Sequence, residues 1–307
     1  AFIHGGPFAN IAHGNSSIIA DKLALSAADI VVTEAGFGSD MGAEKFMHIK
    51  AATSGKSPDC IVMNVTIRSM KLHGGAFGSR GGYRPSKEEL EAENIEAVAT
   101  GAATNLDRHI RNMAGFGVPV IVSINKFISD TDGEIKALSD AAHASGAKAV
   151  TITEVHAKGG EGGEDLAKAV VKAVQDHVAA GRPFTPLFVD DAPIMEKVEA
   201  IATRMYKAKD VYVETAAKKQ LDRIISWGYG NLPVCMAKTQ YSFSHDAGKL
   251  GAPSDFTLPI REFRLNSGAG FVVAILGNMM TMPGLPKRPA AIDMDMDDDG
   301  NQTGVFG

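Results

Sequence analysis

Short apolar runs alternate with longer amphipathic stretches over the first two thirds of the chain. Four runs rich in Val and Ile end in Gly, Asn or acidic turns, at residues 29–38, 60–68, 118–127 and 147–155. Nearly continuous hydrophobicity of this kind is typical of strands buried on both faces of a parallel sheet. The pattern therefore predicts four strands of one mostly parallel sheet.

Helical patterns separate these runs. The sequence SKEE at 86–89 is a capping box, which predicts the start of a helix that continues to residue 113. Farther along, four apolar residues recur at intervals of four and mark one face of another helix: Leu166, Val170, Val174 and Val178. Strands that alternate with helices indicate an α/β fold, with the sheet flanked by helices.

The last third of the chain has a different pattern. Short apolar runs at 210–214 and 232–238 precede a longer one at 256–277, in which NSGAG predicts a hairpin turn between two strands. This favours a C-terminal α+β domain. A chain of 307 residues is too long for one small core. We expect three domains, at 1–107, 108–202 and 203–307.

Charge and composition exclude some partners. The net charge is −5 and no stripe of Lys and Arg is present, so a duplex nucleic acid is not an expected partner. No apolar run approaches the ~20 residues of a membrane span. Cys60 and Cys235 both lie in apolar, strand-like runs. They are interpreted as reduced core residues of a cytoplasmic protein.

A glycine turn, GFGSDMG at 36–42, joins a predicted strand to a predicted helix. Glycines at such a position let a phosphate or a ring approach the backbone, although a plain tight turn fits the pattern as well. The GxGxxxG spacing departs from the dinucleotide fingerprint, which disfavours a nicotinamide-dependent oxidoreductase. Phe37, between two of the glycines, would offer a flat group an aromatic ring to stack on.

Two further candidates lie at predicted strand ends, where α/β folds place their ligands. Phe127 is a second aromatic residue at such an end. His156 and Lys158 flank the glycine-rich stretch 158–165, whose free N–H groups could bind an anion at the start of a helix. The acidic residues within that stretch could satisfy the same helix end, and both interpretations stay open.

Other motifs fail on spacing. The GKS within 53–60 lacks the preceding Gly and strand of a P-loop, so we interpret it as a surface loop. DMDMDDDGN at 293–301 imitates half of an EF-hand loop, but Phe306 stands where Glu is required, which favours an acidic hairpin turn. His4 and His13 are too few for a zinc site. No metal site is expected in this chain.

Several long motifs occur in order: HGGPFANIAHG, VTEAGFGSDMGAEKF, NKFISDTDGE, KGGEGGEDLA, GYGNLPVCMAKTQYSFSHD and TMPGLPKRPAA. Together they closely resemble formate–tetrahydrofolate ligase, over residues 1–307. The resemblance implies an ATP-dependent ligase that makes formyl phosphate from formate and transfers the formyl group to tetrahydrofolate. It also implies Mg²⁺, a monovalent cation, a cytoplasmic location and a homotetramer.

The resemblance implies two groups of site residues. The purine-site residues, which would form or neighbour an adenine pocket, are Ala9, Asn10, Gly36, Phe37 and Gly38. The pterin-site residues are Phe127, which matches an aromatic that stacks on the pterin, together with His156 and Lys158. His156 stands where the family motif WAKGGEGG has Trp. We expect weaker or pH-dependent folate binding, because imidazole buries less area than indole and can carry charge.

The family's P-loop lies in a large segment that would precede this chain. We therefore expect residues 1–107 to be the remainder of a nucleotide-binding domain and 108–202 to contribute the folate site. The P-loop would come from a segment or companion chain outside these residues. The alternative is a non-catalytic module that binds adenine or folate or assists assembly. The stretch 74–89 is longer than the family pattern. Its Arg80, Tyr83 and Arg84 would contact folate glutamate or another subunit, unless this is a disordered surface loop.

Overall fold

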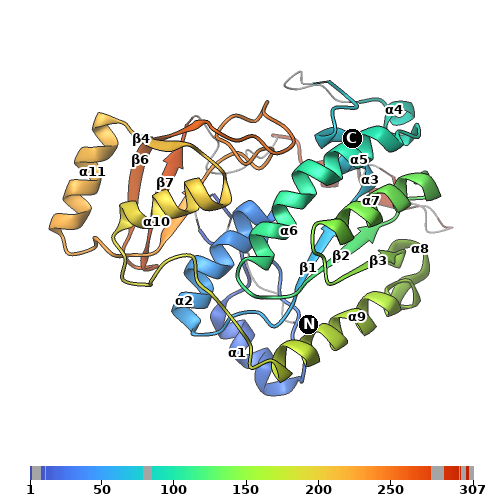
Figure 1. Cartoon of the computed structure of the whole chain (residues 1–307), viewed down its shortest axis with the longest axis horizontal. Coiled ribbons are helices and arrows are strands. Elements are labelled where there is room, and N and C mark those ends of the chain that lie inside the picture. Colours follow the sequence, from blue (N-terminus) through green and yellow to red (C-terminus); the bar gives the residue numbers. More distant parts are fainter. Residues whose placement is uncertain are drawn as a thin grey trace.

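Two larger β-sheets, a small two-stranded one and the helices around them make up the described part of the structure (Figure 1). The computed structural model describes residues 1, 8–10, 12–78, 85–277, 287–296, 298 and 302–303. Its strands are β1 Ile61–Val65, β2 Val120–Asn125, β3 Ala149–Thr153, β4 Asp210–Val213, β5 Val234–Ala237, β6 Thr257–Asn266, β7 Phe271–Leu276, β8 Asp295–Met296 and β9 Gln302–Thr303.

The helices alternate with these strands. They are α1 Ile18–Ala27, η1 Ser39–Ala43, η2 Phe46–Lys50, α2 Ala51–Ser54, α3 Ile67–His73, α4 Lys87–Glu91, α5 Ile95–Gly101, η3 Ala102–Leu106, α6 Asp107–Ala114, α7 Asp132–Ala144, α8 Val155–Lys158, η4 Gly159–Gly163, α9 Glu164–Ala179, α10 Ile194–Ala200, η5 Ile201–Met205, α11 Thr215–Ser226 and η6 Ala290–Ile292. None of the helices in the described residues is long and apolar enough to cross a bilayer.

The first sheet is parallel, in the order β1-β2-β3. Three of the four predicted strands are confirmed in it. The prediction of a strand at 29–38 is wrong, because only one isolated bridge, between Asn15 and Ala35, involves that segment. A strand needs a neighbour for its backbone N–H and C=O groups, and no strand in the described part of the chain lies beside these residues. Val32 is consequently 90 % exposed.

The predicted capping box is confirmed, but the long helix after it is interrupted. Ser86 and Glu89 cap α4, which ends at Glu91. Asn94 then begins a second helix by accepting a hydrogen bond from the N–H of Ala97. Because Asn competes for backbone hydrogen bonds, it favours a helix start over a helix interior. From there α5, η3 and α6 run without a break; we call them the long helix (95–114).

The second sheet is mixed and has the order β4-β6-β7-β5. β4 and β6 are parallel, β5 and β7 are parallel, and β6 and β7 form the predicted antiparallel hairpin around 267–270. Helices α10 and α11 pack on this sheet, at the left of Figure 1. The expected C-terminal α+β unit is therefore confirmed. The three-domain division stays a prediction; residues 107 and 202 both lie within helices.

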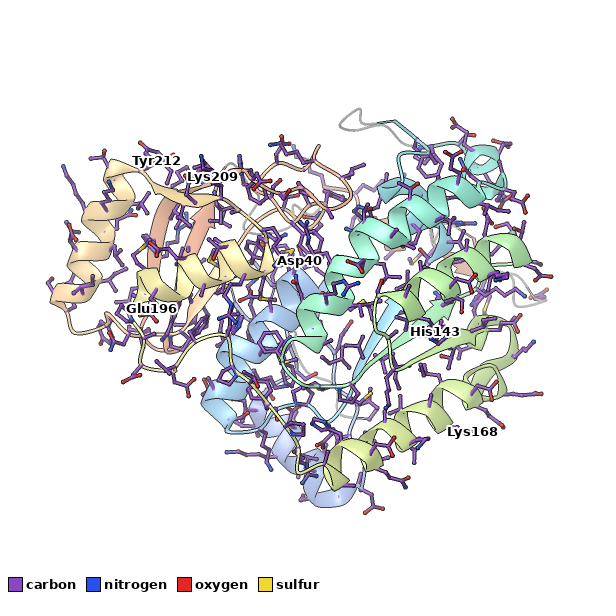
Figure 2. The ribbon with its side chains drawn as sticks, in the orientation of Figure 1. Asp40, His143, Lys168, Glu196, Lys209 and Tyr212 are labelled. Carbon is purple, nitrogen blue, oxygen red and sulfur yellow. The ribbon has the colours of Figure 1, made fainter. Side chains whose placement is uncertain are left out.

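A single helical segment, which we call the central helix (39–54), lies between the two sheets. It consists of η1, η2 and α2 with residues 44 and 45 between them, and it contains two π-helical stretches. One continuous hydrophobic core runs from β1 and β2 through the long helix to β6 and β7. Figure 2 shows Asp40, at the start of the central helix, near the middle of the molecule.

Smaller sequence predictions can also be compared with the structure. Cys235 is buried and Cys60 partly exposed, and both thiols are free. In the acidic stretch, β8 and β9 pair antiparallel, as the hairpin prediction requires. The remaining predictions concern residues outside the described ranges: His4, Arg80, Tyr83, Arg84 and Phe306.

Candidate functional site

A cavity of about 1230 Å³ opens between the first sheet and the start of the central helix. All five residues of β1 line it, together with Phe37, Gly38, Ser39 and Asp40. Its other walls come from α1, the 29–35 segment, the rest of the central helix, the 54–60 segment, α3, the long helix, α9, Arg182 and residues 240–243. A space of this size is large enough for a nucleotide or a similar ligand. The predicted glycine turn therefore borders the large cavity.

The glycine turn is held in place by backbone contacts. The N–H of Gly36 donates to the carbonyl of Gly14 at 2.9 Å. A Cβ at Gly42 would lie 2.1 Å from the oxygen of Gly36, so only glycine allows the central helix to begin this close to the turn. Phe37 has a left-handed backbone (φ 60°) and a 47 % exposed side chain. A non-glycine residue in this conformation is strained, which is common where a ligand binds.

The purine-site residues lie in one neighbourhood. Ala9 is buried and in contact with Gly14, which bonds Gly36. The ring of Phe8, the residue before Ala9, meets the ring of Phe37 edge to face at 5.6 Å. Asn10 is also buried. Phe37 and Gly38 line the cavity itself, whereas Ala9, Asn10 and Gly36 are not among its lining residues.

A buried ion pair fixes the first turn of the central helix. The Asp40 carboxylate accepts a hydrogen bond from the Lys238 ammonium, which directly follows β5 and also donates to the carbonyls of Thr239 and Ser242. Burial, the largest single influence, would raise the pKa of Asp40, but the charge and hydrogen bond of Lys238, together with His109, outweigh it and the pKa is lowered. Asp40 is therefore ionised, and the pair ties the glycine turn to the second sheet.

Two histidines from different helices border the same wall. His109, on the long helix, shares a 2.6 Å hydrogen bond between its Nδ1 and the hydroxyl of Ser39. Burial lowers the pKa of His109 to about 4, although the negative charge of Asp40 acts in the opposite direction and raises it. Burial also lowers the pKa of His73, whose Nδ1 accepts from the N–H of Gly251. Both imidazoles are therefore uncharged near pH 7 and offer the cavity neutral polar groups.

The pterin-site residues gather at a different place, the carboxyl edge of the parallel sheet. Phe127 follows β2, is 37 % exposed and lies under the Arg68 guanidinium, 4.4 Å from its ring centroid. Its N–H donates to Asp130 at 2.8 Å, which fixes the loop. Phe127 is not among the residues that line the large cavity, although Ser69, next to Arg68 on α3, is. Helix α3 thus links the two sites.

The end of β3 supplies charged neighbours to this edge. Glu154 bonds Lys158 at 2.6 Å and lies 3.7 Å from Lys126, the residue before Phe127. The pKa of Glu154 is lowered, first by its hydrogen bond from Lys158. His156 is exposed on the short helix α8. The predicted residues Phe127, His156 and Lys158 therefore belong to adjacent strand ends.

Sequence reasoning missed Ser39, Asp40, His109, Lys238 and Arg68. Lys238, which directly follows the apolar run 232–237, was one available signal. A lysine at the end of a strand in the core cannot extend its ammonium to water, so the sequence indicates that it has a buried partner. The Ser39–His109 contact joins residues 70 positions apart and has no local signal. Among the described residues, no group of three or more His, Cys, Asp or Glu could hold a metal ion.

The chain was compared with models of known protein families. The family model described as formate--tetrahydrofolate ligase matches residues 1–306, which is nearly the whole chain.

Proposed function

Because the chain belongs to the formate–tetrahydrofolate ligase family, we propose that it forms the purine and pterin sites of an enzyme that joins formate to tetrahydrofolate with ATP. In this reaction a formate oxygen attacks the γ-phosphorus and releases ADP. The N10 amine of tetrahydrofolate then attacks the formyl carbon and releases phosphate, which gives 10-formyltetrahydrofolate. The observation that carries the proposal is the family match over residues 1–306.

The cavity supports the nucleotide part of this proposal. Phe37 is exposed, flanked by two glycines and open to a space of about 1230 Å³. A purine could stack on its face, and Ala9 and Asn10 would back that contact. Because His109 and His73 are neutral, the charges in this region would be those of the bound phosphates and their cations. Mg²⁺ would be held by those phosphates, since the described part of the chain offers no cluster of metal ligands.

The edge of the parallel sheet supports the folate part. A half-exposed Phe127 has Arg68 on one side of its ring, so a pterin could occupy the open side. His156 is close enough in the chain to the Glu154–Lys158 pair to share this edge, and imidazole would take the place of the family's Trp. Exchanging His156→Trp should lower the KM for tetrahydrofolate in the assembled enzyme. An unchanged KM would argue against a folate contact at His156.

The phosphate-binding loop would come from a P-loop segment outside these 307 residues, either an earlier part of the same polypeptide or a companion chain. No GxxxxGK[ST] motif occurs in the sequence. β1 is an edge strand of its sheet, and its whole length borders the cavity that Phe37 lines. A parallel strand added beside β1 would bring the loop after it to the carboxyl edge of the sheet, where phosphates bind.

The alternative is a non-catalytic module that binds adenine or folate, or that assists assembly. The absence of a P-loop motif from residues 1–307 is the observation that favours it. The two functions are distinguished by assaying ADP release with formate, tetrahydrofolate and ATP, with and without an added P-loop segment. Activity that appears only with the segment supports the ligase. Ligand binding with no turnover in either case supports the module.

Two substitutions test the site residues in the active assembly. Phe37→Ala should raise the KM for ATP about tenfold, and Phe127→Ala the KM for tetrahydrofolate about tenfold, because stacking of a ring on an aromatic side chain contributes ~1–3 kcal/mol. Ile128→Ala is the matched control for Phe127, since Ile128 is its fully exposed neighbour. Tyr212→Ala is the control for Phe37, since Tyr212 is also an exposed aromatic residue but does not line the cavity. Equal effects of variant and control would refute the assignments.

A further inference from the structure

A second cavity, of about 660 Å³, opens on the outer surface of α6. Its other walls are part of η3, residues 115–116, the loop at 185–187, the end of η5, Lys207 and Ala252. It shares no lining residue with the cavity at β1, so it is separate from the proposed nucleotide site. Neither the family match nor the resemblance in sequence assigns a ligand to it.

The lining of this cavity is strongly cationic in a chain that is acidic as a whole. Four cationic side chains line it: Arg108, Arg111, Arg204 and Lys207. Asp107 is the one carboxylate in the lining, and it is paired with Arg111 at 2.8 Å. Among the described residues, no carboxylate lies within salt-bridge distance of the other three cations, although the charge of Asp107 also acts on Arg108. The lining therefore carries more positive than negative charge.

Backbone contacts hold two of these cations in position. Arg108 donates to the carbonyl of Pro253, and Arg204 donates to the carbonyl of Leu187 at 2.7 Å. Each guanidinium has five N–H donors, so these bonds orient the group and leave further donors for another acceptor. The carbonyls are neutral, so both arginines keep their full charge within the cavity wall.

Lys207 adds a third cation at a strained position. Its backbone is left-handed, with φ 61°, and its backbone carbonyl accepts a hydrogen bond from the backbone N–H of Asp255 at 3.0 Å. The floor of the cavity is formed by the buried side chains of Phe116 and Met205, and Thr104 and Thr185 add hydroxyl groups to the walls. Three cations without a salt bridge among the described residues thus line a concave space that is large enough for a small molecule.

We propose that this cavity binds a small polyanion whose phosphate or carboxylate groups lie side by side. Guanidinium forks match both kinds of group with paired hydrogen bonds, so phosphate and carboxylate share the recognition chemistry. A diphosphate and an oligoglutamate chain are the two sources of such charge that the test distinguishes. A singly charged anion would engage only one of the three cations and bind weakly.

The test is titration calorimetry on the 307-residue chain at low salt, with inorganic pyrophosphate in one arm and a triglutamate peptide in the other. Binding in either arm should weaken about five- to tenfold in Arg204→Gln and in Lys207→Gln. It should also weaken as salt is added, because exposed charges are screened. Lys209→Gln is the control, since Lys209 is exposed two residues away and does not line the cavity (Figure 2).

Each outcome of the titration either supports or overturns the proposal. Binding of pyrophosphate alone identifies a phosphate site, binding of triglutamate alone a carboxylate site, and binding of both a site that reads charge spacing. No binding in either arm overturns the proposal, and so does an equal loss of affinity in Lys209→Gln. Thermal unfolding of each variant verifies its fold, and because Arg204 and Lys207 are both exposed, either variant suffices if the other is unstable.

Discussion

At the scale of single residues, the central helix is unusual for the charges it buries. Asp40, Glu44, Lys45, His48 and Lys50 are all nearly inaccessible to solvent. Four of these five residues have a charged or titratable partner: Asp40 pairs with Lys238, Glu44 with His48, and Lys50 with Asp21. Burying a charge is costly without such a partner, and Lys45 is the exception here, since its Nζ has no hydrogen-bond partner among the described residues. The Asp40–Lys238 pair ties the start of the central helix to the second sheet, and the Lys50–Asp21 pair ties a later part of it to α1.

His109 makes the stability of the fold depend on pH in one direction. Its pKa is about 4 in the folded protein, below the ordinary value of 6.5, so the unfolded chain binds the proton more tightly. Stability is therefore complete above pH 6.5 and is lost as the pH falls from 6.5 toward 4, by up to about 3 kcal/mol. His109→Asn, which keeps a polar group near Ser39 but does not titrate, should remove this part of the pH dependence.

Urea unfolding of both proteins at pH 7 and at pH 4.5 measures the effect. The substitution lowers the stability at both pH values, so the relevant quantity is the change with pH and not the absolute value. A wild-type protein whose stability falls no more steeply than that of His109→Asn would show that the imidazole is not held neutral by burial.

The close packing of the glycine turn against the central helix depends on Gly42. A Cβ at this position would lie 2.1 Å from the oxygen and 2.6 Å from the nitrogen of Gly36, and neither backbone atom can move alone. We expect Gly42→Ala to lower the free energy of unfolding by about 2–4 kcal/mol, as other overpacked sites do. Gly160→Ala is the control, because a Cβ there meets nothing within 4 Å. Similar urea midpoints for the two variants would contradict the argument.

At the scale of elements, strands could be predicted from sequence where the chain supplies their neighbours. The runs at 60–68, 118–127 and 147–155 pair with each other and form β1, β2 and β3. The run at 29–38 is also rich in Val and Ile, but among the described residues it has only the isolated Asn15–Ala35 bridge and no neighbouring strand, and it is not a strand. Hydrophobicity indicates what a segment would bury, whereas a strand also requires a partner. The break at Asn94 had a local signal, since Asn favours helix starts.

The free edge of β1 leads to a prediction about assembly. Val62 is 44 % exposed on β1, and Ile152 is 47 % exposed on β3, the opposite edge of the same sheet. If a P-loop segment adds a strand at β1, Val62→Lys should abolish the gain of ATP-dependent activity that the segment brings, because a charge would be buried in the new contact. Ile152→Lys should leave that gain intact.

The measurement is ADP release at increasing concentrations of the P-loop segment, with both variants checked for unchanged thermal unfolding. The two edge residues have similar exposure and both project from strands of the same sheet, so the comparison isolates the edge. Equal responses of Val62→Lys and Ile152→Lys would place the added segment elsewhere.

At the scale of the whole molecule, the candidate residues had local signals in the sequence, whereas the way the site is built did not. Phe127 follows a strand, as predicted, but the strand predicted before Phe37 does not form, so Phe37 is marked only by the glycines on either side of it. The Asp40–Lys238 pair joins residues 198 positions apart, and the cavity at β1 is formed by segments from α1 to residue 243. Such arrangements depend on how the two sheets pack around the central helix, which no window of sequence contains.

The distribution of exposed apolar side chains leads to a prediction about the chain alone. α1 has no buried residue, and its Ile19 is 80 % exposed, while Val32 is 90 % exposed. Val32 and residues of α1 other than Ile19 line the cavity at β1. Apolar surface gathered in one place promotes association. We expect the isolated chain to self-associate at micromolar concentration, as size-exclusion chromatography with light scattering would detect, and the Ile19→Ser/Val32→Ser variant to shift it toward the monomer. Tyr212→Ser, which removes an exposed ring on β4, should have no such effect.

Because a P-loop segment at β1 would cover the same surface, its addition should suppress self-association as the double substitution does. A chain that stays monomeric throughout, or that responds equally to Tyr212→Ser, would remove this surface as the place where such a segment docks.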